Sequence, residues 1–183
     1  MDRSLLDLLR RSVDEFNAEV ARQRSLDPQW WANLTGACLQ GSKLRRANLS
    51  GAKLWDADLR LTDLRGADLT RAGLVGANLQ GACLREAKLR RANLETAVLV
   101  GADLRRADFK ETQLWRANLE SADLAEADFR KAHLVRAYLA EANFTGTVAE
   151  GAVITSADFT GARGLPEALK KRVLAELADS WGD

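Results

Sequence analysis

The sequence predicts an all-β solenoid with an α-helix at each end, and a repeat of five residues is the main reason. An apolar residue, large in every repeat except the one with Ala149, recurs at every fifth position from Leu34 to Phe159, which gives 26 consecutive repeats over residues 32–161. Twenty of these central residues are Leu and four are Phe, and Ala stands two residues earlier in 22 repeats. No residue is inserted or lost along the way. Tandem copies of one short unit indicate a solenoid, since a single unit cannot bury its own apolar face.

The period of five excludes both a continuous helix and a continuous strand as the repeating element. On a helix, successive central residues would advance by about 140° and scatter around the cylinder. On a strand they would point to alternate faces, because five is an odd number. A short extended segment followed by a turn fits the pattern, since Ala and the Leu two residues later then face the same side. We therefore expect each repeat to point its Ala and Leu into the core.

The outward residues indicate how many repeats make one coil. Two sets recur mainly at a spacing of 20: Arg45, Arg65, Arg85 and Arg105, and Trp55, Val75, Trp115 and Val135. This spacing favours four repeats per coil over the alternative of three. Four per coil gives about 6.5 coils stacked at the spacing of neighbouring strands, about 4.8 Å. Asn or Asp precedes the central residue in 14 repeats, where its side chain can hydrogen-bond the backbone at a corner.

The repeats resemble those of the pentapeptide-repeat family, whose consensus is A(D/N)LXX. Matching copies include ANLTG, ANLSG, ADLTR, ANLQG, ADFKE and ADFTG, and the resemblance covers residues 32–161. It implies a right-handed quadrilateral β-helix. The best understood family role is binding to type II DNA topoisomerases, notably gyrase, by resembling duplex DNA, which protects these enzymes from quinolones or natural-product toxins. Some members dimerise through their C-terminal coils, which implies a homodimer contact at that end.

Residues 1–31 are expected to be an N-terminal capping segment, because an open solenoid end exposes its core and unpaired strand edges. Ser4 and Asp7 resemble a capping box, so one amphipathic helix is expected over residues 4–23. Its apolar stripe consists of Leu5, Leu6, Leu9, Val13, Phe16 and Val20. Asp27 and Pro28 end the helix, and Trp30 with Trp31 can cover the first coil.

Residues 162–183 are expected to contain a second helix, over residues 166–180. Gly164 breaks the repeat, and Pro166 suits a first helical position. An apolar stripe recurs every four residues: Leu169, Val173, Leu177 and Trp181. This stripe either caps the last coil or forms the contact of a dimer.

One side of the predicted column is basic. The candidate basic face comprises Arg45, Arg65, Arg85, Arg105, Arg90, Arg91, Lys110 and Arg130. Acidic residues such as Asp63, Asp103 and Glu111 interrupt it. We favour a solvated face of mixed ion pairs over a site for an acidic partner or a phosphate.

Two adjoining faces carry large apolar residues in outward positions. This apolar patch comprises Trp55, Leu61, Val75, Val98, Val100, Trp115, Val135 and Tyr138. Exposed apolar patches of this kind usually mark a binding site for a partner molecule. The alternative is that the N-terminal helix folds back and covers the patch.

The composition argues against chemistry in the chain. His133 is the one histidine, and Cys38 and Cys83 are expected to be free thiols on different faces. No phosphate-binding, dinucleotide-binding or nucleophile motif is present, so we expect no enzyme, metal site or cofactor. With 27 basic and 26 acidic residues, direct binding of nucleic acid is not expected. A signal peptide and a run of about 18 apolar residues are both absent, which predicts a cytoplasmic protein without a membrane span.

The predicted function is that of a non-enzymatic protein that presents a rigid surface to a macromolecular partner. The family resemblance makes it a candidate gyrase-interacting protein that confers protection from topoisomerase inhibitors. The net charge of +1 counts against DNA mimicry, which needs an acidic face. The uninterrupted repeats also lack the loops on which some quinolone-resistance members depend. The alternative is a scaffold or regulator that acts through the apolar patch or the basic face, with no topoisomerase role.

Overall fold

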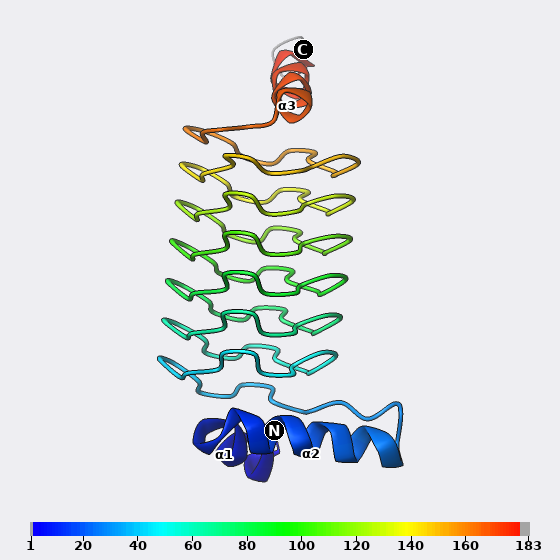
Figure 1. Cartoon of the computed structure of the whole chain (residues 1–183). Coiled ribbons are helices and arrows are strands. Elements are labelled where there is room, and N and C mark those ends of the chain that lie inside the picture. The colour runs from blue at the N-terminus through cyan, green and yellow to red at the C-terminus, as the bar shows by residue number, and fades with distance from the viewer. Residues whose placement is uncertain (1, 180–183) are drawn as a thin grey trace.

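The computed structural model describes residues 2–179, which form a column of stacked coils between helical ends (Figure 1). Within this range, helices α1 (Arg3–Arg11) and α2 (Val13–Leu26) lie beneath the first coil, and α3 (Glu167–Asp179) stands on the last. In successive repeats, the residue before the central one forms an isolated parallel bridge to the residue 20 positions later, from Asn33 with Lys53 to Asn143 with Arg163. Four repeats therefore make one coil, as the spacing of the outward residues predicted.

A tight turn follows the central residue of every repeat. In one of them, the Ala102 N–H donates to the Leu99 carbonyl at 3.0 Å, and Gly101 between them has a φ of 63°. A positive φ at the third residue of such a turn is the geometry of a type II turn. All 26 turns share it, yet the third residue is glycine in only ten of them, and in the other 16 it is a residue such as Thr96, at 56°. The left-handed conformation is therefore imposed by the coil and not by glycine.

The Asn and Asp side chains that precede the central residue brace these turns. In each of the 14 repeats that have one, the side-chain Oδ1 accepts the backbone N–H two residues later, at 2.9–3.4 Å. This bond satisfies an N–H that has no carbonyl partner in the neighbouring coil. The predicted corner hydrogen bond is thus present in every repeat that can make it.

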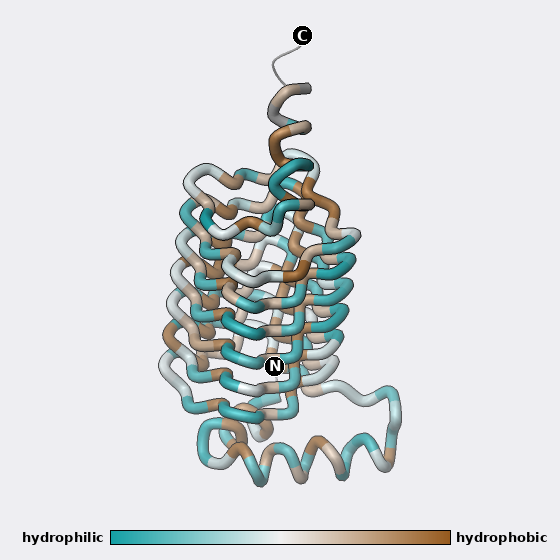
Figure 2. The backbone as a smooth tube through the Cα atoms, turned by 45° about the horizontal axis from the view of Figure 1, so that its top comes forward, coloured by the Kyte–Doolittle hydropathy of each residue, from teal (hydrophilic) through white to brown (hydrophobic). Residues whose placement is uncertain are grey.

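The core of the column consists of the inward Ala and Leu or Phe side chains, which are buried in nearly every repeat. Figure 2 shows residues of like hydropathy stacked above one another along the column. Phe109 and Phe129 stack with ring centroids 4.6 Å apart. Where Thr replaces Ala at positions 62 and 112, the buried hydroxyl donates to a backbone carbonyl at 2.9 Å. The core therefore tolerates these polar groups because each has a hydrogen-bond partner.

The N-terminal segment contains two helices, so the prediction of one helix over residues 4–23 is wrong. Ser12 has an extended backbone, with φ −153° and ψ 115°, and interrupts the helix there. Its hydroxyl accepts the Glu15 N–H and caps α2. Asp2, and not Ser4, caps α1 by accepting the N–H groups of Ser4 and Leu5. Serine competes for backbone hydrogen bonds inside a helix and favours a cap position, which explains the break.

Helices α1 and α2 cap the first coil. Of the predicted apolar stripe, Val13 is partly buried against the core and the other five members are buried in it. The helices also pair with backbone groups that have no coil below them. The Asp2 N–H donates to the Asn33 carbonyl at 2.7 Å, and the Asn17 side-chain oxygen accepts the Asn48 N–H at 2.7 Å. The helices thus protect the strand edges of the first coil and leave the apolar patch uncovered.

At the other end, α3 begins at Glu167, one residue later than predicted. The Pro166 carbonyl accepts the Lys170 N–H at 2.9 Å, which makes Pro166 the residue before the helix. Leu169 is buried and Val173 packs partly buried against the core. The Leu177 side chain and Trp181 lie outside the described residues. Half of the predicted stripe therefore packs as a cap, while α3 stands upright on the column (Figure 1).

The turn geometry predicts the sign of a glycine substitution. Gly101→Ala should lower the free energy of unfolding by about 1 kcal/mol, because alanine is strained at positive φ. A Cβ at Gly101 would meet nothing within 4 Å, so steric crowding does not contribute. Thr96→Gly, at the same turn position of the preceding repeat, should not destabilise the protein. Urea unfolding measures both. A more stable Gly101→Ala variant, the usual result at an ordinary φ, would contradict the turn assignment.

Candidate binding surfaces

The apolar patch lies at the surface. Trp55 and Tyr138 are each 47% exposed and Leu61 is 65% exposed, while the other five members are partly exposed. The outward position after the central residue is occupied, in five successive coils, by Trp55, Val75, Glu95, Trp115 and Val135. The patch is therefore a ladder with one charged interruption and not a continuous apolar surface.

Glycines of the next coil let two of these side chains lie against the column. A Cβ built on Gly73 would lie 2.5 Å from Trp55 Nε1, and one on Gly81 would lie 2.9 Å from Leu61 Cδ2. Trp55 thus covers Gly73, which is the one glycine in the sequence at the position before a central residue. That unusual glycine was a sequence signal for the position of Trp55. Held in this way, the ring loses less conformational entropy when a partner covers it.

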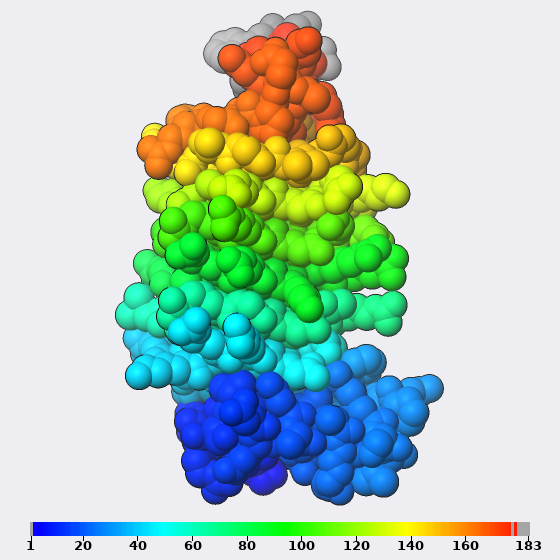
Figure 3. All heavy atoms as spheres, in the orientation of Figure 1, coloured from blue at the N-terminus to red at the C-terminus, as the bar shows by residue number. Residues whose placement is uncertain are grey.

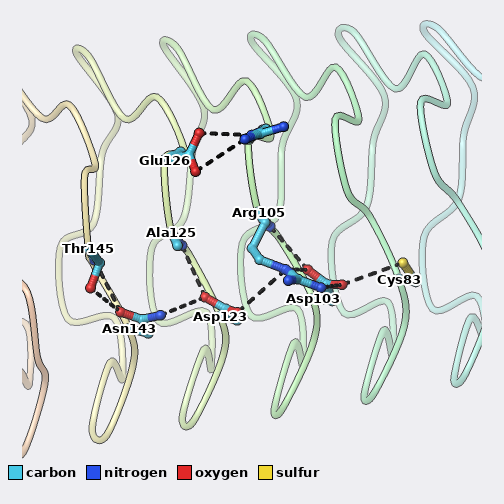
Figure 4. Close-up of polar contacts among 9 residues, drawn as sticks. Cys83, Asp103, Arg105, Asp123, Ala125, Glu126, Asn143 and Thr145 are labelled. Carbon is cyan, nitrogen blue, oxygen red and sulfur yellow. Dashed lines mark hydrogen bonds and ion pairs between the residues drawn. The ribbon is translucent and has the colours of Figure 1, made fainter.

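The first column of the basic face consists of Arg45, Arg65, Arg85 and Arg105, which stack as predicted. Arg65 donates to both oxygens of Asp63, at 2.8 and 2.5 Å, and Arg105 donates to both oxygens of Asp103, at 2.8 and 2.7 Å (Figure 4). Arg105 Nε also lies 3.5 Å from Asp123. The hydrogen bonds from Arg65 and Arg105 lower the pKa values of Asp63 and Asp103, so both stay ionised at neutral pH.

The second column of the basic face is paired in the same way. Arg90 and Arg91 share the carboxylate of Glu111, each with a hydrogen bond of 2.8 Å, and these bonds lower the pKa of Glu111 to about 2. Burial raises the pKa of Asp128, but hydrogen bonds from Arg130 and Lys110 outweigh it and lower the pKa to about 2. These contacts fit a face of mixed ion pairs, whose net charge is much smaller than its arginines suggest.

A groove of about 470 Å³ lies at the C-terminal end, between the last coil and α3. Its apolar lining includes Ile154, Phe159 and Val173. The Ser156 N–H donates to Glu176 Oε2 at 3.0 Å, which ties the helix to the coil on one side. Helix α3 therefore leaves part of the last coil open, in contrast to the closed N-terminal end. Sequence reasoning did not reveal this groove, because it depends on the angle at which α3 stands.

The residues that could take part in catalysis or metal binding lie apart from one another. His133 is exposed, Cys38 is an exposed free thiol, and Cys83 is a partly buried one whose Sγ lies 3.8 Å from Asp103 Oδ2. Within residues 2–179, no group of three or more His, Cys, Asp or Glu side chains is placed to hold a metal ion. No helix in that range is both long and apolar enough to span a bilayer.

Similar solved structures are repeat proteins of varied roles. Rfr23, a pentapeptide-repeat protein from the cyanobacterium Cyanothece 51142, is 33% identical over 52% of this chain, with a TM-score of 0.43. The matched part spans 62% of Rfr23. HetL from Nostoc sp. strain PCC 7120, involved in heterocyst differentiation regulation, is 31% identical over 71% of this chain and 75% of its own, with a TM-score of 0.25. Full-length QnrB1, a plasmid-mediated fluoroquinolone resistance protein, is 20% identical over 79% and 84% of the two chains, with a TM-score of 0.39.

A comparison with curated proteins found no significant match. The family model for pentapeptide repeats matches in 8 copies, over residues 31–66, 62–91, 87–125 and 132–163. Pentapeptide-repeat proteins form right-handed quadrilateral β-helices, and the bridges between residues 20 positions apart agree with that fold. With more than half of its residues matched, the chain belongs to the pentapeptide-repeat family.

Proposed function

We propose that the protein is a non-enzymatic binding protein that presents the apolar patch of its rigid column to a protein partner. The observation that carries the proposal is the exposure of this patch, where Trp55 and Tyr138 are each 47% exposed. No described helix covers them, since α1 and α2 lie beneath the first coil and α3 stands on the last (Figure 1). Exposed aromatic side chains at outward positions indicate an interface, and Trp and Tyr are among the residues that contribute most to binding energy at such surfaces.

The column supports this role mechanically. The aromatic rings rest on backbone that is hydrogen-bonded to the coils above and below, and Arg116 stacks on the Trp115 ring at 5.1 Å from its centroid. A partner therefore meets a preorganised surface, which lowers the entropic cost of binding. The basic face is a weaker candidate, because six of its eight members already have carboxylate partners: Arg65, Arg90, Arg91, Arg105, Lys110 and Arg130. The role needs no cofactor, and the free thiols of Cys38 and Cys83 support a reducing, cytoplasmic location.

A type II topoisomerase is the narrower candidate partner. The family resemblance implies DNA gyrase, with protection from topoisomerase inhibitors as the outcome. Charge opposes recognition by DNA mimicry, since Asp63, Asp103 and Asp128 are each paired with Arg or Lys. We therefore propose that contact with gyrase is made through the apolar patch. A scaffold without any topoisomerase role is the alternative.

Gyrase assays with a variant of the apolar patch test both whether gyrase is the partner and whether the patch is the contact surface. We expect the purified protein to alter gyrase supercoiling or to relieve quinolone inhibition. Replacing both indoles, Trp55→Ala with Trp115→Ala, should weaken binding by about 2 kcal/mol or more, roughly 30-fold in Kd, because buried Trp side chains dominate interfaces. Binding to immobilised gyrase measures the change, and circular dichroism checks that the variant is folded.

Leu26→Ala is the matched control, since Leu26 is 70% exposed on α2 and outside the patch. This variant should bind as the parent does. No effect of the parent on gyrase at a large molar excess would exclude the topoisomerase role. Equal binding by the parent and the double variant would exclude the apolar patch as the surface that contacts gyrase.

We also propose that two copies associate through their C-terminal ends. The groove beside α3 leaves apolar surface open, and within the described residues the backbone N–H groups of Ile154 and Phe159 have no hydrogen-bond partner. An unpaired edge of this kind favours pairing with another chain. The predicted contact residues Leu169 and Val173 lie at this end, Leu169 against the core and Val173 at the groove.

Sedimentation measures this association. The parent should form dimers at micromolar concentration, and Val173→Asp should shift the equilibrium to monomers, because it places an unpaired charge in the groove. Leu26→Ala, at the opposite end of the column, should leave the dimer intact. A parent that stays monomeric at all concentrations would contradict the contact.

A further inference from the structure

We propose that a pocket between the end of α2 and the side of the column binds an oxyanion of the phosphate class. The pocket has a volume of about 420 Å³, and its basic lining consists of Arg24 from α2 with Arg71, Arg90 and Arg91 from two neighbouring coils. It arises because the end of α2 and the segment after it extend beyond the outline of the coils (Figures 1 and 3). It belongs to a different face from the apolar patch and is independent of the proposed function.

The register of the coils brings the arginines together. Thr70 and Arg90 occupy one slot in successive coils, and Arg71 and Arg91 occupy the next slot. The Arg71 N–H donates to the Arg90 carbonyl at 3.0 Å, so these coils are direct neighbours. Stacked side chains therefore stand about 5 Å apart, which lets three guanidinium groups and the Thr70 hydroxyl reach one small ligand.

The N-terminal segment supplies a fixed wall. Trp31 covers Gly51, where a Cβ would overlap the ring, and the Arg24 guanidinium lies 5.2 Å from the Trp31 ring centroid. Arg24 Nη1 donates to Ser50 Oγ at 2.9 Å, and Nη2 donates to the Ser50 carbonyl. Its Nε is buried and has no hydrogen-bond partner within residues 2–179. Arg24 is thus held in place by Ser50 and Trp31, and it contributes a fixed positive charge to the wall of the pocket.

The charges of the pocket do not cancel. Arg90 and Arg91 share Glu111, which orients both guanidinium groups but neutralises only one charge. Arg71 makes no ion pair within the described residues. Asp68 also lines the pocket, and its Oδ1 accepts the Thr70 N–H at 2.9 Å. The charged lining residues, counted together with Glu111, are four arginines and two carboxylates, which leaves a formal charge of +2.

This surplus identifies the ligand class. Stacked like charges repel, so the cluster is relieved by a multivalent anion. Guanidinium groups bind phosphate oxygens through paired, charge-assisted hydrogen bonds. The ligand is a phosphate group with two negative charges, either as the free ion or as the terminal phosphoryl group of a small molecule.

Calorimetric titration of the full chain tests the pocket, with inorganic phosphate, pyrophosphate and glycerol phosphate as probes. We expect saturable binding at one site that weakens as salt is added. Shifts in the nuclear magnetic resonance spectrum should be confined to the Trp31 indole and to the amides near Thr70 and Arg71. Tighter binding of glycerol phosphate than of phosphate identifies a phosphoryl ester as the ligand, and equal binding identifies the free ion.

Two variants separate the pocket from general surface charge. Arg71→Gln with Arg91→Gln should weaken binding by at least about tenfold, the loss expected when a charged hydrogen bond is removed. Arg130→Gln changes a basic residue of the same face that is paired with Asp128 and lies outside the pocket. It should leave the affinity unchanged. An equal loss in both variants, or no saturable binding of any probe at millimolar concentration, would overturn the proposal.

Discussion

Hydrogen bonding between successive coils, at a fixed register of 20 residues, is the interaction on which the rest of the structure depends. In a typical repeat, the N–H groups of Leu79 and Gly81 donate to carbonyls of the next coil, at 2.6 and 3.0 Å. These bonds close only if each repeat turns the chain by the same amount. Each turn also requires its third residue to be left-handed. All 26 repeats meet this requirement, although in 16 of them that residue has a side chain, which makes the conformation costly. Stacking of the coils therefore compensates for the strain in the turns. One inserted residue would disrupt both the hydrogen bonds between coils and the regular turns.

The same register converts sequence spacing into surface chemistry. Residues 20 apart stand one above the other, so that an Arg column beside an Asp column becomes a ladder of ion pairs, as between Arg105, Asp103 and Asp123 (Figure 4). Such exposed pairs contribute little to stability but remove the field that stacked arginines would create. Where the column holds Trp and Val instead, the surface stays apolar. The sides of the column thus differ in what they can bind although their backbone is the same.

Much of the fold could be predicted from the sequence because the constraint is periodic. The inward Ala and Leu, the four repeats per coil and the corner bonds of Asn and Asp all follow from position within the repeat. The break at Ser12 could not be predicted, because the apolar stripe continues across it from Leu9 to Val13 and a serine can either remain inside a helix or cap a new one. Nor did spacing show that Trp31 rests on Gly51 beside Arg24, since that contact depends on where α2 ends. Which arginines lack a carboxylate partner likewise depends on rotamers that the sequence does not specify.

Amide hydrogen exchange tests the coil register most directly. In each inner repeat, four of the five N–H groups donate to backbone carbonyls, whereas the residue after the central one donates only to an Asn or Asp side chain or to none. Exchange should therefore show a period of five residues, with the fastest amides at positions such as Val75, Val100 and Trp115. Protection of the other amides should be similar throughout the inner coils. Exchange without this period, or with the period of a helix, would contradict the stacked column.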